Sequence, residues 1–191
     1  MIFVKDVEAI VRNKLKNQPK QSLAHDFNHF CRVRKNALKI AKHYSIVDLE
    51  VLQLACLLHD VDQPFDAKRE HVEKSISLAR EILSSINYPR IERVIEVMSQ
   101  HSTEKLSEKT SLEAKILFDA DKLDGLGPIG VARVFALCGQ QGKTIPQAIA
   151  WYEKKIEVAL SDLQTPEGKK LIEKELVYTR RYLEELKSVF S

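Results

Sequence analysis

Apolar residues recur along most of the chain at the three- and four-residue spacing of amphipathic helices. Prolines, glycines and short polar stretches interrupt this pattern, and helix-capping residues precede two of its segments: Asp48 before one, and either Ser22 or Asp26 before another. The pattern predicts helices over residues 4–15, 30–41, 49–59, 72–83, 91–98, 112–124 and 129–137, followed by two longer helices within 145–191. No stretch alternates with a strand period for more than a few residues. We therefore expect an all-α fold.

The sequence also predicts two polar connecting segments and one apolar helix face. Residues 102–111 are expected to form a loop, and residues 138–145, with two glycines, either a lid or a simple connector. The last helix carries one apolar face interrupted only by Thr179; its members are Ile172, Leu176, Leu183, Leu186 and Phe190. Such a face predicts packing against the rest of the domain or against a second subunit, so a homodimer is one open expectation.

Length, composition and charge narrow the class of protein. A chain of 191 residues with 44% hydrophobic and 30% charged residues suits one globular domain that needs no disulfides. The net charge of +3 disfavours duplex nucleic acid as the main partner, whereas a small phosphorylated ligand needs only a few positive groups. The three scattered cysteines, the early charge at Lys5 and the lack of an apolar run of about 20 residues predict a cytoplasmic protein without a membrane partner.

Candidate chemistry centres on His59 and Asp60, which follow the apolar pair Leu57-Leu58. A carboxylate and an imidazole at the end of a buried run are costly unless something satisfies them, and one bound cation serves both. Neighbouring helical residues point about 100° apart, so both reach one ion only near a helix end, which the break after Asp62 supplies. The alternative is a core histidine beside a capping aspartate.

A second group of polar residues follows Pro19. His25, His29 and Arg32 are four and three residues apart, so their side chains share one helix face. Both imidazoles then face one cavity, or they form an ordinary pair of surface histidines. Asp26 either caps this helix or hydrogen-bonds the far nitrogen of a ligand histidine.

A third group lies in an otherwise apolar segment, where Asp119, Asp121 and Asp124 crowd together. Like charges this close raise one another's pKa unless a cation or a lysine such as Lys122 neutralises them. Two further histidines, His71 and His101, lie at edges of apolar helices, where a histidine is either a solvated end residue or part of a site.

In chain order these residues give H…HD…D, which resembles the signature of the HD superfamily of metal-dependent phosphohydrolases. The matching stretches are His25-Asp26-Phe27-Asn28-His29, Ala55-Cys56-Leu57-Leu58-His59-Asp60 and Asp119-Ala120-Asp121-Lys122-Leu123-Asp124. They resemble the small prokaryotic HD hydrolases that include nucleotide pyrophosphohydrolases. The resemblance covers about residues 20–140 and implies an HD-domain helical bundle, a single domain over 1–191 with the helices of 145–191 packed on its core.

The resemblance also implies a site. His29, His59, Asp60 and Asp121 would bind one divalent transition metal ion, with Mn, Ni, Co, Fe and Zn all compatible. The ion would polarise a phosphoryl group and activate water for hydrolysis of a phosphate ester or anhydride. Asp62 and Glu70 are candidates for orienting that water. Candidates for contacting the substrate are His25, Arg32, Lys68, His71, His101 and Lys122.

Other functions remain open beside hydrolysis of a nucleotide or another small phosphorylated metabolite. His71 and His101 extend the pattern to H…HD…H…H…D, which would hold a second metal in a phosphodiesterase or a diiron oxygenase. The short interval between Asp60 and His71 favours one metal, with both histidines on the substrate. A third alternative is a regulatory module that binds a nucleotide without turning it over.

Overall fold

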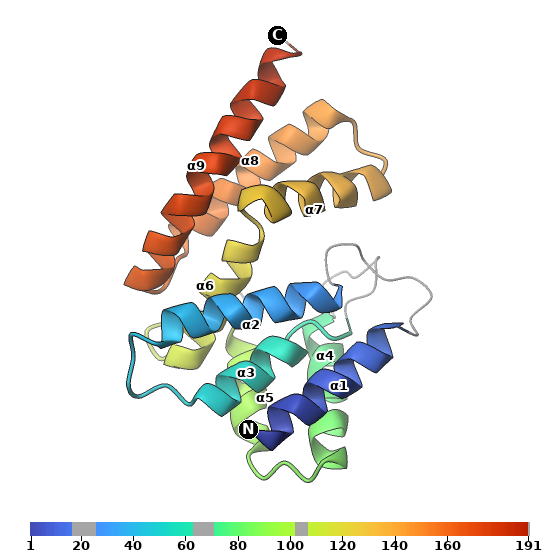
Figure 1. Cartoon of the computed structure of the whole chain (residues 1–191), viewed down its shortest axis with the longest axis vertical. Helices are drawn as coiled ribbons and strands as arrows, with labels where there is room; N and C mark the ends of the chain where they lie inside the picture. Colours follow the sequence, from blue (N-terminus) through green and yellow to red (C-terminus); the bar gives the residue numbers. More distant parts are fainter. Residues whose placement is uncertain (17–25, 63–70, 102–106, 191) are drawn as a thin grey trace.

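The computed structural model describes residues 1–16, 26–62, 71–101 and 107–190, with only the backbone of His71 and Val72. Regular structure in these ranges is helical throughout, which confirms the all-α prediction (Figure 1). The helices are α1 (Ile2–Lys16), α2 (Phe27–Ala41), α3 (Leu49–Leu58), α4 (His71–Ser85), α5 (Ile91–Gln100), α6 (Leu112–Asp124), α7 (Gly127–Gln140), α8 (Ile145–Ser161) and α9 (Pro166–Ser188).

Helix α3 lies at the centre of the larger hydrophobic core and contacts α1, α2, α4, α5 and α6. It begins as the sequence predicts, because Asp48 Oδ1 accepts hydrogen bonds from the backbone N–H groups of Glu50 (3.2 Å) and Val51 (3.1 Å). Every residue from Val51 to Leu58 is buried. Burying a leucine side chain contributes roughly 1.5–3 kcal/mol, so this core holds the end of α3, and His59 with it, in a fixed place.

Helix α2 packs along α3 and α6. Of its two candidate caps, Asp26 fulfils the role: its Oδ1 accepts a hydrogen bond from the backbone N–H of His29 at 2.8 Å. Ser22 lies outside the described residues. One face of α2 is buried, and its apolar members are Phe30, Val33, Ala37, Ile40 and Ala41. This face fixes the rotation of α2 about its axis, and thereby the direction of His29.

Helices α7, α8 and α9 pack on one another around a second hydrophobic cluster. Figure 1 shows them as a separate group beside α2, joined to the larger core by α6. Much of the predicted apolar face of α9 is buried within this group, since Ile172, Leu176 and Leu183 belong to the cluster. Phe190, beyond the end of α9, is 53% exposed.

Helix α7 is longer than predicted. It begins at Gly127 and passes through Gly139, whereas the pattern predicts residues 129–137. Gly127, the first residue of α7, adopts a positive φ of 68°, which lets the chain turn sharply out of α6, and Pro128 follows in the first turn. A glycine inside a helix costs only about 1 kcal/mol, so Gly139 does not end it. The predicted loop over 138–145 therefore reduces to residues 141–144.

Asp119 joins α6 to the start of α9. This fully buried carboxylate accepts hydrogen bonds from the backbone N–H groups of Gln164 (2.9 Å) and Thr165 (2.7 Å) and from the Thr165 hydroxyl (2.6 Å). Gly168 leaves room for it, since a Cβ there would lie 2.3 Å from Asp119 Oδ2. In the acidic group of α6, Asp119 thus fixes α9 and takes no part in the cluster around Asp121.

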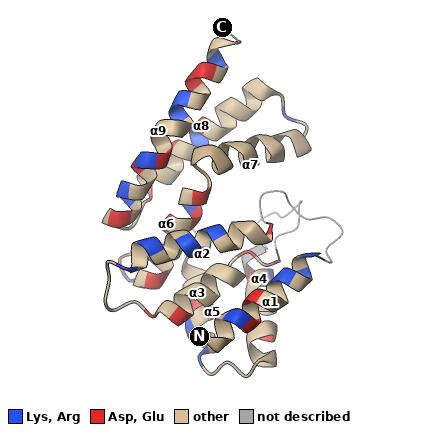
Figure 2. Ribbon diagram, in the orientation of Figure 1, with Lys and Arg blue, Asp and Glu red and all other residues tan. Residues whose placement is uncertain are grey.

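Most charged residues of the described helices are exposed or half-buried. Figure 2 shows few of them along α3 and α7, where Glu50 and Arg133 are the charged residues. Across the described ranges, every helix is either too short or too polar to cross a membrane.

Candidate metal centre

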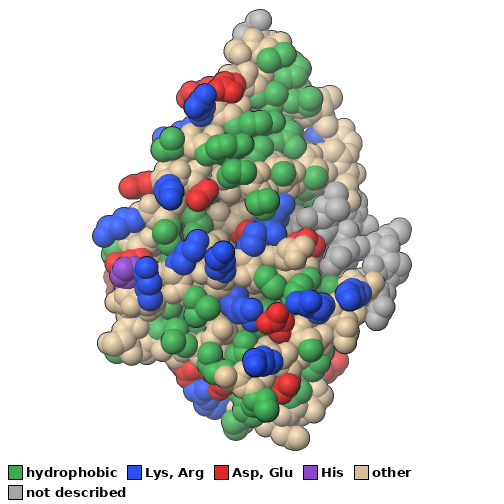
Figure 3. Space-filling model, viewed as in Figure 1, with side chains coloured by type: hydrophobic (Ala, Val, Ile, Leu, Met, Phe, Trp, Pro, Cys, Tyr) green, Lys and Arg blue, Asp and Glu red, His purple; other side chains and the backbone are tan. Residues whose placement is uncertain are grey.

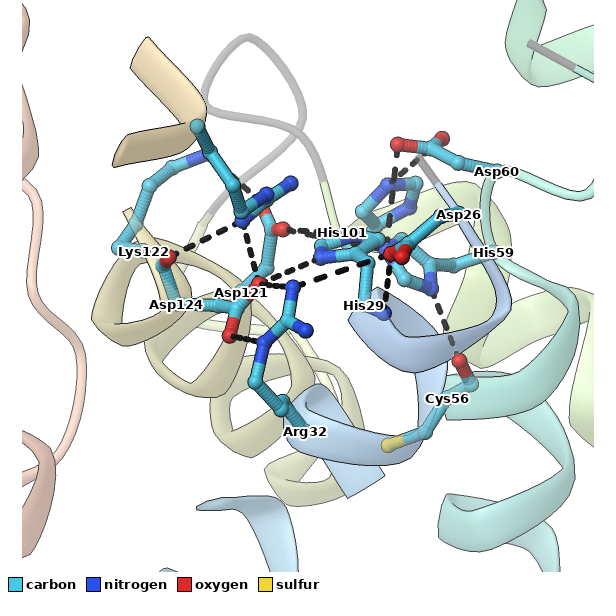
Figure 4. A network of polar contacts seen from close by, with 11 residues as sticks. Asp26, His29, Arg32, Cys56, His59, Asp60, His101, Asp121, Lys122 and Asp124 are labelled. Atoms are coloured by element: carbon cyan, nitrogen blue, oxygen red, sulfur yellow. Dashed lines mark hydrogen bonds and ion pairs between the residues drawn. The ribbon is translucent and has the colours of Figure 1, made fainter. Parts of the chain in front are cut away.

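Four helices bring the predicted residues together at one end of the larger core. His29 comes from the first turn of α2, His59 and Asp60 follow the last turn of α3, His101 follows α5, and Asp121 lies in α6. Figure 4 shows these side chains pointing toward one another. His29, His59 and His101 are 1%, 0% and 7% exposed, so three imidazoles meet in a space from which the protein largely excludes water.

The facing atoms are three Nε2 nitrogens and two carboxylates. Asp121 Oδ1 lies 3.7 Å from His29 Nε2 and 3.9 Å from His59 Nε2. Asp60 Oδ2 lies 3.8 Å from His59 Nε2, while Asp60 Oδ1 lies 3.9 Å from His101 Nε2. Ligand atoms of His29, His59 and Asp121 all fall within 4.8 Å of one another. These separations exceed hydrogen-bond length and suit atoms arranged around a common centre.

The other ring nitrogen of each histidine is held by the protein. His29 Nδ1 lies 2.8 Å from Asp124 Oδ2, His59 Nδ1 lies 3.0 Å from the Cys56 carbonyl oxygen, and His101 Nδ1 hydrogen-bonds the Met98 carbonyl oxygen. Each of these oxygens can only accept, so each Nδ1 donates and carries the proton in the neutral ring. The lone pair is then on Nε2 in all three rings, directed at the two carboxylates.

Asp124 lies behind His29 and contacts three side chains. Its carboxylate is 4% exposed and accepts hydrogen bonds from Arg32 Nε (2.6 Å), Arg32 Nη2 (3.1 Å) and Arg133 Nη1, in addition to the one from His29. Burial raises the pKa of Asp124, but His29, Arg32 and Arg133 outweigh it and hold that pKa below its usual value. The carboxylate therefore stays ionised, fixes the His29 ring and raises the basicity of its Nε2.

The protonation of the cluster follows from burial and the two facing carboxylates. Burial lowers the pKa of His29 and of His101. Burial also lowers the pKa of His59, but the charges of Asp60 and Asp121 outweigh it and raise that pKa above 6.5. For Asp121, burial raises the pKa, yet Lys122 and the two nearest histidines bring it well below its usual value. The carboxylates thus attract positive charge to the centre, as a proton on His59 or as a cation.

The donor set fits a divalent metal ion. His59 Nε2 is buried and makes no hydrogen bond within the described part of the chain. An unsatisfied buried nitrogen of this kind costs about 1–3 kcal/mol, and a metal at the centre would satisfy it. Two imidazole nitrogens with two carboxylates suit a transition metal better than Mg²⁺ or Ca²⁺, which prefer oxygen.

Positive side chains flank the centre on the side of α6 and α8. Lys122 Nζ lies 3.2 Å from Asp121 Oδ2 and 4.8 Å from the centre of the Phe118 ring. Burial lowers the pKa of Lys155, on α8, and the charge of Lys122 lowers it further while Asp121 raises it. Arg32 is held by Asp124, with 29% of its side chain exposed. Two of the predicted phosphate-binding groups, Arg32 and Lys122, therefore lie next to the cluster.

The remaining predicted residues are placed only in part. Asp62 follows the HD pair by two residues, and its backbone N–H donates to Ser75 Oγ at 3.1 Å. His25, Lys68 and Glu70 lie outside the described residues, and His71 begins α4 with an undescribed side chain. Their predicted roles stay predictions.

Sequence reasoning missed two residues of the network. Asp124 appears there only as a member of an acidic group, and Arg133 does not appear at all. Arg133 is the lone charge within α7, and an isolated arginine in an apolar helix is a usable signal for a buried ion pair. Its partner could not be read from the pattern, because the turn at Gly127 decides which face of α7 meets α6.

Comparison with known proteins adds a family assignment. The model of the HD domain family matches residues 26–126, more than half of the chain. YpgQ of Bacillus subtilis is 33% identical over an alignment of 129 positions, which covers 64% of this chain and 61% of YpgQ. The chain thus matches about three fifths of the length of this relative.

Two solved structures share the fold over nearly the full length. The structure of Bacillus subtilis YpgQ in complex with ADP has a TM-score of 0.76 at 23% identity and covers 97% of this chain and 96% of YpgQ. An HD-superfamily hydrolase from Bacillus thuringiensis also has a TM-score of 0.76, at 21% identity, and the match covers 98% and 96% of the two chains. These likenesses extend the shared architecture to the helices beyond residue 126.

Proposed function

The chain belongs to the HD domain family, and from this premise we propose that it is a metal-dependent phosphohydrolase acting on a nucleotide or another small phosphorylated metabolite. The observation that carries the proposal is the convergence of the imidazoles of His29 and His59 with the carboxylate of Asp121. Nothing else in the described structure gathers histidine with acidic groups in this way. The ADP held by the YpgQ structure supports a nucleotide as the ligand class.

In this proposal His29, His59, Asp60 and Asp121 hold one divalent ion. Bound there, the ion supplies Lewis-acid activation of water and of the phosphoryl group near neutral pH. The protein keeps the two histidines as neutral ligands through the hydrogen bonds at Nδ1 to Asp124 and to the Cys56 carbonyl oxygen. It also sets the ligand directions before the substrate arrives, which removes an ordering cost from the reaction.

Lys122 and Lys155 would contact the non-bridging oxygens of the phosphoryl group. Lys122 Nζ lies 3.2 Å from Asp121 Oδ2, and the charge of Asp121 raises the pKa of Lys155, so we place the substrate phosphate beside these two lysines. Such charges stabilise a transition state in which negative charge spreads over the equatorial oxygens. Asp62 remains our candidate for orienting the attacking water, and His101, beside Asp60, for contacting the substrate.

One metal per chain is the state we propose. Asp60 lies between His59 and His101, so a second ion would have to share this carboxylate and recruit further ligands. A dinuclear site remains the competing assignment, since it would use the side chain of His71. Counting metal ions per chain after loading with Mn²⁺ and gel filtration separates the two: one ion supports our assignment, and two support the alternative.

The proposed activity is tested by incubating Mn²⁺-loaded protein with a panel of nucleoside mono-, di- and triphosphates and measuring phosphate and pyrophosphate. We expect release from at least one compound, and its loss in His59→Gln and Asp121→Asn. His43→Gln is the matched control, because His43 is exposed and belongs to no part of the cluster. Full activity in His59→Gln would refute the site. Binding of a nucleotide with no product would favour the regulatory module.

A further inference from the structure

A cavity of about 290 Å³ lies between α2, the junction of α6 with α7, and α9. Its rim is basic: Arg32, Lys35 and Lys39 come from α2, and Lys174 comes from α9. The lining also has an apolar part, which we call the floor and which includes Leu126, Ile129 and Leu171. Figure 3 shows the Lys and Arg side chains gathered over α2 on this face of the molecule. None of the imidazoles of the metal centre lines this cavity.

Three of the four rim residues are lysines: Lys35, Lys39 and Lys174. Within the described structure, none of Lys35, Lys39 and Lys174 has a carboxylate oxygen within 4.0 Å. Lys35 and Lys39 are one turn apart on the same helix, a like-charge arrangement that costs a few tenths of a kcal/mol, about 0.2–0.5, when nothing neutralises it. Solvated lysines often tolerate such a cost, but here three of them surround a hollow that a ligand can enter.

The two acidic groups of the lining are already engaged. Asp124 accepts from His29, Arg32 and Arg133, as described above. The Glu175 carboxylate lies against the backbone at the start of α7, where a Cβ on Gly127 would come within 2.2 Å of its Oε2. A carboxylate at a helix N-terminus is stabilised by the helix dipole. With four positive and two negative side chains, the lining of the cavity keeps an excess of positive charge.

We propose that this cavity binds a small organic phosphate, as a second site apart from the metal centre. The phosphate oxygens accept hydrogen bonds from the lysine ammonium groups, and the amide of Asn36 offers one more polar contact. The apolar part of the ligand covers the floor at Ile129 and Leu171. A volume near the lower limit of ligand pockets, about 300 Å³, suits a molecule no larger than a nucleoside monophosphate.

Arg32 links this second site to the metal centre. Arg32 lines the cavity, and its guanidinium hydrogen-bonds Asp124, which orients His29. A phosphate that draws hydrogen bonds from Arg32 weakens its hold on Asp124 and changes the support of the His29 ring. Linkage is reciprocal, so loading of the metal must in turn change the affinity of the cavity for its ligand.

Binding is tested on the metal-free full-length protein in EDTA, by equilibrium dialysis with labelled AMP. We expect saturable binding in the wild type and about tenfold weaker binding in the triple variant Lys35→Gln/Lys39→Gln/Lys174→Gln, since each exposed charge contact contributes a factor of roughly 1.5–5. The control Lys16→Gln/Lys109→Gln/Lys154→Gln removes the same charge from exposed positions elsewhere and should bind as the wild type does. Equal affinity in all three proteins, or no binding at all, would overturn the proposal.

Two competition experiments against labelled AMP define which part of the ligand the cavity recognises. Adenosine should fail to compete, because it lacks the phosphate, and competition by adenosine would contradict the assigned role of the lysines. Inorganic phosphate should compete more weakly than AMP, because it leaves the apolar floor uncovered. Equal competition would contradict the assigned role of Ile129 and Leu171. These outcomes do not depend on hydrolysis, so they stand apart from the proposed activity.

Linkage is tested by titrating Mn²⁺ with and without saturating AMP. We expect AMP to change the Mn²⁺ affinity of the wild type by about fivefold or more, a typical coupling, and to change that of the triple lysine variant much less. An equal change in both proteins would mean that AMP acts at the metal itself and would refute the linkage. No change in the wild type would refute it as well.

Discussion

Replacing Asp124 by asparagine tests how the protein prepares His29 for a metal. The substitution keeps the shape of the side chain and removes its charge. In the structure one buried carboxylate serves His29, Arg32 and Arg133 at once, with contacts of 2.8 Å to His29 and 2.6 and 3.1 Å to Arg32. An amide has one acceptor oxygen for these donors and adds an NH₂ group that repels them.

The expected magnitudes follow from burial. Leaving a fully buried charge without its partner costs about 3–5 kcal/mol, but the Arg32 side chain is 29% exposed and recovers part of its hydration. We therefore expect Asp124→Asn to lower the free energy of unfolding by about 2–3 kcal/mol. Loss of the carboxylate behind a ligand histidine typically weakens metal affinity by about 10–100-fold.

Asp119→Asn is the matched control for this experiment. Asp119 lies five residues earlier on α6 and is equally buried, and among the described residues its hydrogen bonds go to the start of α9. This variant should also lose stability, by about 1–3 kcal/mol, because a buried donor loses its acceptor. Its Mn²⁺ affinity should stay within about twofold of the wild type, since the hydrogen bonds of Asp119 to described residues go to Gln164 and Thr165 and not to a proposed ligand.

Isothermal titration with Mn²⁺ and urea unfolding in EDTA measure the two quantities separately. The reasoning predicts that both variants lose stability and that Asp124→Asn alone loses metal affinity. If Asp124→Asn binds Mn²⁺ as tightly as the wild type, the hydrogen bond to His29 does not prepare the ligand. If Asp119→Asn loses as much metal affinity as Asp124→Asn, general destabilisation explains the effect.

Three further expectations follow from the structure. Gly168→Ala should lower the free energy of unfolding by about 1–3 kcal/mol in thermal unfolding, because its Cβ would meet Asp119. Gly139→Ala, with open space at its Cβ, should raise the free energy of unfolding by about 0.5–1 kcal/mol. Equal effects of the two substitutions would contradict the packing. Mn²⁺ affinity measured by calorimetry should fall as the pH is lowered from about 8 to 6, because the raised pKa of His59 lets protons compete, and a flat profile would argue against a neutral His59 ligand. His101→Gln should keep one Mn²⁺ per chain and lower kcat, and loss of the metal would make His101 a ligand.

Much of the fold was predictable because its signals are local. Asp48 and Asp26 cap α3 and α2 as their positions before apolar segments predict. The C-terminal end of α7 was not predictable, because a single glycine in a helix costs too little to end it, and Gly139 lies inside α7. Breaker residues thus fix a helix end only where tertiary contacts agree with them.

The candidate site divides in the same way. His29, His59, Asp60 and Asp121 stand in short motifs, and the structure places their side chains together. The different contacts of Asp119 and Asp124 were not predictable. Residues five apart on one helix face different neighbouring helices, and the sequence does not say which helix each residue faces. Asp119 meets α9 and Asp124 meets two arginines, one of them 92 residues away in the sequence.

The most direct test of the proposed centre is an anomalous diffraction experiment on crystals of the wild-type protein grown with Mn²⁺, with data collected on both sides of the manganese absorption edge. We predict a strong anomalous peak per chain enclosed by His29 Nε2, His59 Nε2 and carboxylate oxygens of Asp60 and Asp121. A fully loaded crystal whose manganese lies elsewhere, with hydrogen bonds in place of a metal between these four residues, would contradict the account.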